Sequence, residues 1–155
     1  MKLTIRQANV SDTDNIYSIL ITYSVEGTII ERTRVDIKKN IDKFFIADIK
    51  NNIAGVISYY HYSDKLIEVR SLAVKKEYYK KGIGSALLNK LINSLLTDFP
   101  KAKIFALSYH PLFFKKSGFI EVIKDSLPEK IWKDCKKCEN QHNCGETALL
   151  FSMPK

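Results

Sequence analysis

Residues 66–96 contain the feature that most constrains the fold: an apolar strand pattern, a short basic link with two glycines, and a long amphipathic pattern. Apolar residues dominate Leu66–Val74, and the leucines and isoleucines that follow Ser85 recur at the spacing of one helix face. Between them, Gly82-x-Gly84 predicts a turn that opens the helix. A helix that starts after such a turn presents backbone N–H groups and the positive end of its dipole to one spot. The unit therefore predicts a phosphate-binding loop.

The composition is that of one basic, folded domain spanning residues 1–155. Of the 155 residues, 45% are hydrophobic and 27% are charged, which suffices for a core. The net charge of +8 suits a polyanionic partner, but the lysines occur as scattered pairs, so most are expected on solvated faces. No apolar run is long enough to span a bilayer, and residues 1–10 lack the apolar block of a signal peptide. We therefore expect a cytoplasmic protein.

Hydrophobic periodicity predicts elements in the order β-α-α-β-β-β-α-β-α-β-β. The first helix is expected to be capped by residues 11–14, and the shorter second helix has Ile37, Ile41 and Phe44 on its apolar side. Short polar turns join the next three strands, which predicts an antiparallel meander. These strands are expected at 44–49, 53–60 and 66–74. After the long helix we expect strands at 104–108, 119–123 and 147–153, with a short helix at 111–116.

The glycine turn, Tyr79-Lys80-Lys81-Gly82-Ile83-Gly84, fits neither GxGxxG nor GxxxxGK[ST]. It resembles motif A of the GNAT acetyltransferases, [Q/R]-x-x-G-x-[G/A], which binds the pyrophosphate of acetyl-CoA. Tyr79 stands where Arg or Gln is usual, and Lys80 and Lys81 are expected to supply the positive charge. The order of elements is also the GNAT order. The resemblance implies a single-domain α/β (α+β) fold: a mixed, mostly antiparallel sheet of about seven strands flanked by about four helices.

In that family the fourth and fifth strands splay apart, and the pantetheine arm of acetyl-CoA lies in the wedge between them. An unpaired strand edge offers amide donors and acceptors to such a ligand. By this resemblance the backbone of residues 72–74 would hold the pantetheine arm and the thioester. The residues implied in cofactor binding are Leu72, Ala73, Val74, Tyr79, Lys80, Lys81, Gly82, Ile83, Gly84, Ser85, Phe113 and Lys116.

Three further stretches are similar to the short, single-domain N-acetylglutamate synthases, which are bacterial GNAT enzymes of arginine biosynthesis. These stretches are Glu26–Arg32 (EGTIIER), Glu68–Val74 (EVRSLAV) and Leu127–Cys138 (LPEKIWKDCKKC). The similarity covers most of the chain, and departs after the third cysteine, where Gly145-Glu146 replaces an acidic pair. It implies transfer of acetyl from acetyl-CoA to the α-amine of L-glutamate in a ternary complex.

Amine acetylation requires a base for the ammonium and hydrogen-bond donors for the developing oxyanion. Glu68 is the candidate base, because it stands where other GNAT enzymes carry a base glutamate; the alternative is a strand carboxylate paired to Arg70. Arg70, two residues on and on the same face, is a candidate clamp for a substrate carboxylate. Arg32 is the candidate for the second carboxylate, with Ser71 beside the site. Ordinary surface or ion-pair arginines are the alternative for both.

The leaving thiolate needs a proton, and many GNAT enzymes supply it from a tyrosine four residues before a Gly-Phe pair. In this chain Phe114 occupies that position. Tyr109, just past the strand predicted at 104–108, is the substitute acid that we expect, and a rim or core tyrosine is the alternative.

All three cysteines lie between residues 135 and 144, which argues against a disulfide framework and for a local cluster. Cys135, Cys138 and Cys144, with His142 nearby, are ligand types of a tetrahedral zinc site. Such a zinc would be structural and would pin an insertion at about 124–146. Reduced cysteines in a surface loop are the alternative, and a disulfide is not expected in the cytoplasm.

Two other functions remain open from the sequence. The first keeps the fold and cofactor but acetylates another amino acid, a polyamine or a protein N-terminus. The second is a basic zinc-knuckle module that binds nucleic acid, which leaves the strand, glycine turn and helix unexplained. We favour an enzyme that acts on a small-molecule amine, with no nucleic-acid or membrane partner, and a homodimer stays open.

Overall fold

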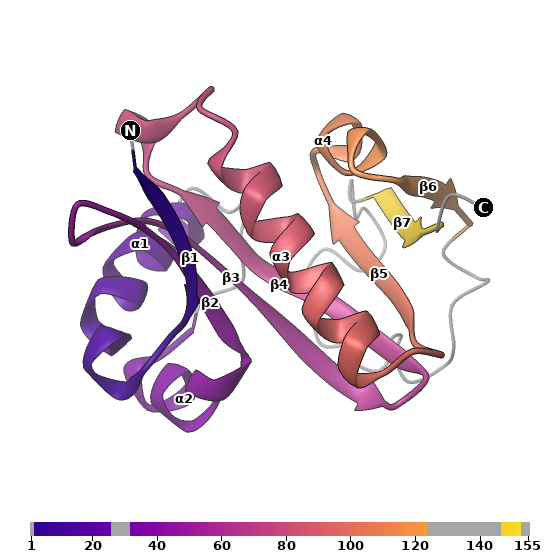
Figure 1. Cartoon of the computed structure of the whole chain (residues 1–155), viewed down its shortest axis with the longest axis horizontal. Coiled ribbons are helices and arrows are strands. Elements are labelled where there is room, and N and C mark those ends of the chain that lie inside the picture. Colours follow the sequence, from indigo (N-terminus) through magenta and orange to yellow (C-terminus); the bar gives the residue numbers. More distant parts are fainter. Residues whose placement is uncertain (1, 26–31, 124–146, 153–155) are drawn as a thin grey trace.

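The computed structural model describes residues 2–25, 32–123 and 147–152, which form a seven-stranded sheet with helices on it (Figure 1). The strands are β1 (Leu3–Gln7), β2 (Phe44–Ile49), β3 (Asn52–Ser63), β4 (Leu66–Val74), β5 (Lys103–Ser108), β6 (Phe119–Val122) and β7 (Thr147–Phe151). The α-helices are α1 (Thr13–Val25), α2 (Arg34–Lys39), α3 (Ile83–Asp98) and α4 (Pro111–Lys116). Short 3₁₀ helices are η1 (Val10–Asp12), η2 (Ile41–Lys43) and η3 (Lys76–Tyr78).

The strand order is β1-β2-β3-β4-β5-β7-β6. The strands β2, β3 and β4 form the antiparallel meander that their short turns predicted. The pairs β1–β2, β5–β7 and β6–β7 are also antiparallel, whereas β4 and β5 run parallel. The mixed, mostly antiparallel sheet that the resemblance implied is therefore confirmed.

Helices cover both faces of the sheet. On one face lies α3, which Figure 1 shows running across the central strands, and its Leu87, Leu88 and Leu91 are fully buried there. On the other face α1 and α2 bury Ile16 and Ile37 in a second cluster with side chains from β2, β3 and β4. Burial on both faces explains why the central strands are almost continuously apolar.

The parallel strands β4 and β5 are joined only at one end. Their ladder pairs Leu66–Glu68 with Lys103–Phe105, and it stops there within the described residues. Beyond it, residues 69–74 of β4 and 106–108 of β5 separate and leave a wedge whose apex lies at Glu68. The splay predicted between the fourth and fifth strands is thus present, and one edge of β4 faces the wedge.

A β-bulge in β4 lies beside this wedge. The register between β3 and β4 shifts here, so that Ser71 and Leu72 face Ile57 alone, and Ser71 has a φ of 52°. In a regular strand, odd- and even-numbered residues face opposite sides of the sheet. Val69, before the bulge, and Val74, after it, nevertheless both pack in the cluster with α3. One extra residue has therefore exchanged the two faces of the strand, and it bends β4 away from β5.

Two local predictions are wrong. The first helical segment is capped by Asn9, whose side chain and that of Asp12 form a capping box, rather than by residues 11–14. Phe44 is not on the second helix: α2 ends in a cap at Asn40, and Phe44 begins β2, where it is fully buried. Phe44 fits both the helical spacing and the strand predicted at 44–49, and its pairing with Ser58 in the sheet decides for the strand.

Two predicted features fall outside the described ranges. The cysteine-containing insertion at 124–146 and the stretch 26–31 are not described, so the domain boundary predictions stay predictions. In the parts of the chain that are described, no helix has the length and apolar character needed to cross a membrane.

Candidate active site

The N-terminus of α3 has the backbone geometry of the anion cradle that the glycine turn predicted. Gly82, the N-cap, has a φ of 76°, and an added Cβ would meet nothing within 4 Å. The glycine is therefore required by its left-handed backbone and not by space. The first turn closes with the Ala86 N–H on the Gly82 carbonyl at 3.0 Å. The N–H groups of Ile83, Gly84 and Ser85 consequently point beyond the helix end, where the dipole favours an anion.

Gly84 lies in close contact with neighbouring side chains. An added Cβ there would lie 3.2 Å from Cε1 of Phe113 and 3.7 Å from Cγ2 of Val74. The start of α3 therefore packs directly on α4 and on the last residue of β4. This contact places Phe113, a predicted cofactor residue, beside the cradle.

Exposed basic side chains surround the cradle. Lys80, with a φ of 63°, and Lys81 precede Gly82 and are exposed, and the Lys81 Nζ lies 5.7 Å from the centre of the Tyr78 ring. Tyr79 is 46% exposed, and its hydroxyl is hydrogen-bonded to the hydroxyl of Tyr23 on α1. The residues of the predicted phosphate loop thus lie side by side at the start of α3.

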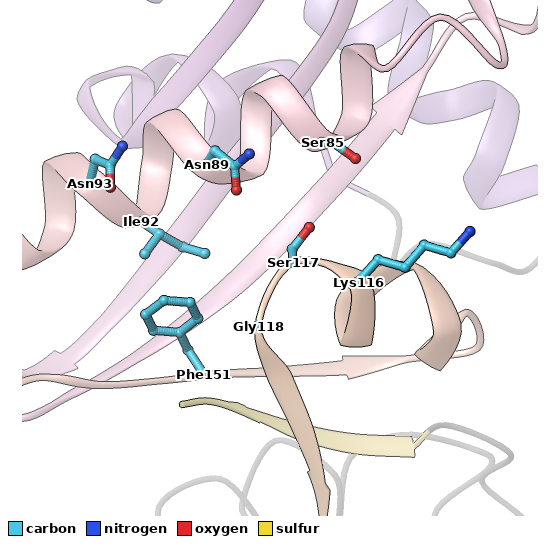
Figure 2. Close-up of a pocket in the computed structure, with 8 residues that line it drawn as sticks. All are labelled: Ser85, Asn89, Ile92, Asn93, Lys116, Ser117, Gly118 and Phe151. Atoms are coloured by element: carbon cyan, nitrogen blue, oxygen red, sulfur yellow. The ribbon is translucent and has the colours of Figure 1, made fainter. Parts of the chain in front are cut away.

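A groove of about 590 Å³ runs from the cradle between α3 and the α4–β6 turn (Figure 2). Figure 2 shows Ser85, Ser117 and Lys116 near one end and Asn93 and Phe151 near the other. The lining residues are Ser85, Asn89, Ile92, Asn93, Lys116, Ser117, Gly118 and Phe151. Sequence reasoning missed the asparagines, although a polar residue at every fourth position of an amphipathic helix marks one face.

The face of β4 that points away from α3 carries a carboxylate and an arginine in contact. Glu68 is 8% exposed, and its Oε1 accepts hydrogen bonds from Nε of Arg70 at 2.8 Å and from the Tyr62 hydroxyl at 3.2 Å. Nη2 of Arg70 donates to the Tyr62 hydroxyl at 3.0 Å, and its guanidinium lies 4.3 Å from the centre of the Tyr60 ring. Glu68 and Arg70 share one face, as their spacing predicted, and they form the ion pair that was the alternative interpretation.

Arg32 forms a second polar cluster. Its Nε lies 2.6 Å from Oδ2 of Asp36, and its Nη1 donates to the hydroxyls of Ser58 at 3.2 Å and Ser71 at 3.3 Å. The hydrogen bond from Arg32 holds the pKa of the Asp36 carboxyl below its ordinary value, and the charge of Arg70 adds to this effect. Asp36 is therefore ionised at neutral pH and fixes the guanidinium of Arg32.

The two clusters meet at the β4 bulge. Ser58 is fully buried, and its hydroxyl donates to the backbone carbonyl of Arg70 at 3.2 Å while it accepts from Arg32. In the β3–β4 ladder Ser58 lies opposite Arg70, and Tyr60 lies opposite Glu68. Sequence reasoning placed Ser58 and Tyr60 in the strand predicted at 53–60 without assigning them to the site, and it missed Tyr62 because it ended that strand at Tyr60. The alternation of Ser58, Tyr60 and Tyr62 on one face was the available signal.

The predicted proton donor and the predicted zinc ligands are not part of these clusters within the described residues. Tyr109 directly follows β5, on the β5 side of the wedge mouth, and is 40% exposed. The four predicted zinc ligands, Cys135, Cys138, His142 and Cys144, lie outside the described residues. Within the described ranges no group of three or more His, Cys, Asp or Glu side chains is placed to hold a metal ion. The zinc site therefore stays a prediction.

Comparison with known sequences identifies a family. Residues 40–121, just over half of the chain, match the Acetyltransferase (GNAT) domain. A Chlorobaculum tepidum protein named "Uncharacterized N-acetyltransferase CT2212" is 36% identical over 96% of both chains. An amino-acid acetyltransferase of Buchnera aphidicola subsp. Schizaphis graminum is 29% identical over 94% of this chain and 32% of its own length. The chain therefore spans about a third of that relative.

Comparison with solved structures agrees on the fold. N-acetylglutamate synthase from Neisseria gonorrhoeae, crystallised with coenzyme A and N-acetyl-glutamate, has a TM-score of 0.88 at 24% identity, over 100% of this chain and 36% of that one. Rv2747 from Mycobacterium tuberculosis, in complex with CoA, has a TM-score of 0.83 at 21% identity, over 97% of this chain and 99% of that one. From the family match and the relative of similar length, this chain belongs to the GNAT family and is an acetyl-CoA-dependent N-acetyltransferase.

Proposed function

We propose that this enzyme acetylates the α-amine of L-glutamate by direct attack on acetyl-CoA within a ternary complex. The observation that carries the proposal is a pair of arginines at the β4 bulge: Arg70 is paired with Glu68, and Arg32 is hydrogen-bonded to Ser71 in the bulge itself. A dicarboxylic amino acid offers one carboxylate to each guanidinium, whose planar fork suits that group. The amino-acid acetyltransferase relatives, and the synthase crystallised with N-acetyl-glutamate, support the same acceptor.

The wedge is the proposed site of the pantetheine arm. The Lys75 N–H donates a hydrogen bond to the Ala54 carbonyl at 2.8 Å, so the backbone groups of Lys75 point toward β3. The backbone N–H and carbonyl of the neighbouring Val74 therefore point the other way, toward the wedge. The pyrophosphate then lies on the start of α3, at the open end. The nucleotide lies along the groove near Lys116. The thioester end reaches toward the apex, where Glu68 lies.

Glu68 is the proposed general base, acting directly or through a water on the substrate ammonium. The freed amine attacks the thioester carbonyl carbon, the carbon–sulfur bond breaks, and the sulfur leaves as a thiolate that takes up a proton. The nitrogen releases its extra proton to solvent and becomes the amide nitrogen of the product. The backbone N–H groups on the open edge of β4 are the proposed donors to the oxyanion. Tyr109, on the β5 side of the wedge mouth, is the proposed proton donor to the thiolate.

Thiol release from acetyl-CoA tests the acceptor directly. We expect the highest kcat/KM with L-glutamate, and at least about tenfold lower values with L-glutamine and L-aspartate. Glutamine lacks the negative charge of the side-chain carboxylate, and the shorter side chain of aspartate holds its carboxylate away from the arginine. A polyamine and a peptide N-terminus complete the panel. Turnover of another amine without glutamate turnover would replace the acceptor and keep the enzyme. Binding of CoA without acetylation of any amine would contradict the proposed mechanism.

Gly82→Ala should weaken binding of CoA about five- to thirtyfold, because an L-residue pays about 1–2 kcal/mol in the left-handed region that the cradle requires. Isothermal titration with CoA measures the effect. Gly82→Asn is the matched control, since asparagine tolerates this region better, and it should lose less affinity than the alanine variant. Equal losses in the two variants would show that the left-handed backbone is not what the cradle needs.

A further inference from the structure

Two tyrosine hydroxyls connect α1 to the phosphate loop. The hydroxyl of Tyr23, on α1, donates a hydrogen bond to the backbone carbonyl of Val74. The hydroxyl of Tyr79 lies in hydrogen-bond contact with that of Tyr23. Because the Tyr23 proton is given to the carbonyl, Tyr79 is the donor within the pair. The hydrogen bonds thus run from Tyr79 through Tyr23 to Val74.

The carbonyl at the end of this chain belongs to the edge that faces the wedge. The bond between the Lys75 N–H and the Ala54 carbonyl, 2.8 Å long, fixes which residues of β4 face β3. Val74, one residue earlier, therefore directs its carbonyl away from β3. Tyr23 covers this acceptor at the point where β4 ends and the phosphate loop begins.

The loop that Tyr79 anchors has an unusual backbone. Lys80 has a φ of 63° and Gly82 a φ of 76°, so two of the four residues from 79 to 82 are left-handed. Tyr79 is 46% exposed, so packing restrains its ring only in part, and its hydroxyl is a specific attachment. A loop that must be ordered when a ligand binds loses affinity to conformational entropy, and a loop held in place beforehand does not.

We propose that Tyr23 and Tyr79 are positioning residues for acetyl-CoA, which hold the phosphate loop against α1 and the end of β4 before the cofactor arrives. This rests on the proposed cofactor site at the wedge and the cradle. Tyr79 occupies the first position of the motif, where Arg or Gln is usual. In this enzyme Tyr79 acts through its hydrogen bond to Tyr23 and does not itself contact the phosphates.

A double-mutant cycle tests the proposal, with Tyr23→Phe, Tyr79→Phe and the double variant titrated with CoA by calorimetry. Each single variant should raise the Kd about three- to tenfold, the value of one hydrogen bond. Because Tyr79 acts through Tyr23, the double variant should be no weaker than Tyr23→Phe alone. The kcat at saturating acetyl-CoA should stay within about twofold, since the reacting groups are untouched. Tyr17→Phe is the matched control on α1: Tyr17 offers its ring to Arg34, 4.0 Å away, and its variant should bind CoA normally.

Unchanged affinity in Tyr79→Phe would overturn the proposal, and so would additive losses in the double variant, which would make Tyr79 a direct ligand. Failure of the unmodified enzyme to bind CoA would instead contradict the proposed cofactor site. If Tyr23→Phe does not fold, hydrogen exchange of Tyr79→Phe without ligand decides. If the hydroxyl of Tyr79 holds the loop, the amides of residues 75–79 should exchange faster in Tyr79→Phe than in the unmodified enzyme. If Tyr79 is instead a direct phosphate ligand, their exchange without ligand should not change.

Discussion

Replacing Glu68 by glutamine should lower kcat at least about a hundredfold, because the amide cannot accept the proton of the substrate ammonium. The structure predicts little structural damage from this change. The Oε1 of Glu68 accepts from Arg70 at 2.8 Å and from Tyr62 at 3.2 Å, and the oxygen of glutamine can accept the same two bonds. The Kd for CoA should therefore stay unchanged. Single-turnover thiol release, with calorimetry for CoA, measures the two quantities separately.

Glu121→Gln is the matched control for this substitution. Glu121 lies on β6, and its carboxylate is 58% exposed and pairs with Lys115 at 3.3 Å. It should retain full activity, since exposed ion pairs contribute little. Near-normal kcat in Glu68→Gln would assign Glu68 to the alternative role, a structural partner of Arg70. A parallel loss of CoA affinity and thermal stability would likewise show that the variant had disturbed the strand and had not removed a base.

The fold was predictable because its signals are local and agree with one another. The repeat of Leu87, Leu88 and Leu91 fixes the buried face of α3, and short polar turns fix the meander. The double assignment of Phe44, to the second helix and to the strand predicted at 44–49, shows the limit of this reasoning. Its spacing fits a helix, yet pairing with Ser58 holds it in β2, and pairing between distant residues is invisible to a local pattern.

The site was predictable only up to the β4 bulge. Glu68 and Arg70 share a face because the irregularity begins after Arg70; one residue earlier, it would have placed them on opposite faces. The cluster around Arg32 depends on Asp36 and on serines from two strands, and no sequence spacing joins those residues. Tyr79 appears in sequence as a departure from a phosphate motif, and only the tertiary structure supplies its partner, Tyr23.

Replacing Arg32 by glutamine should raise the KM for L-glutamate about thirty- to a hundredfold, because a charged hydrogen bond to a carboxylate contributes about 2–3 kcal/mol. The KM for acetyl-CoA should change little, since the cradle lies at the start of α3. Arg32→Lys should give an intermediate value, because an ammonium keeps the charge but lacks the planar fork. Asp36→Asn should also raise the KM for glutamate, since it weakens the 2.6 Å contact that orients the guanidinium.

Arg34→Gln is the matched control for Arg32, because Arg34 is more exposed and pairs with Asp14 at 3.0 Å. Its KM for glutamate should be normal, and equal losses in the two variants would make the role of Arg32 structural. The comparison of glutamate with glutamine then identifies the carboxylate. If Arg32 holds the γ-carboxylate, the preference for glutamate should shrink in Arg32→Gln, because that contact exists for glutamate alone. If it holds the α-carboxylate, both substrates should weaken in parallel, and Arg70 becomes the residue that selects the acidic side chain.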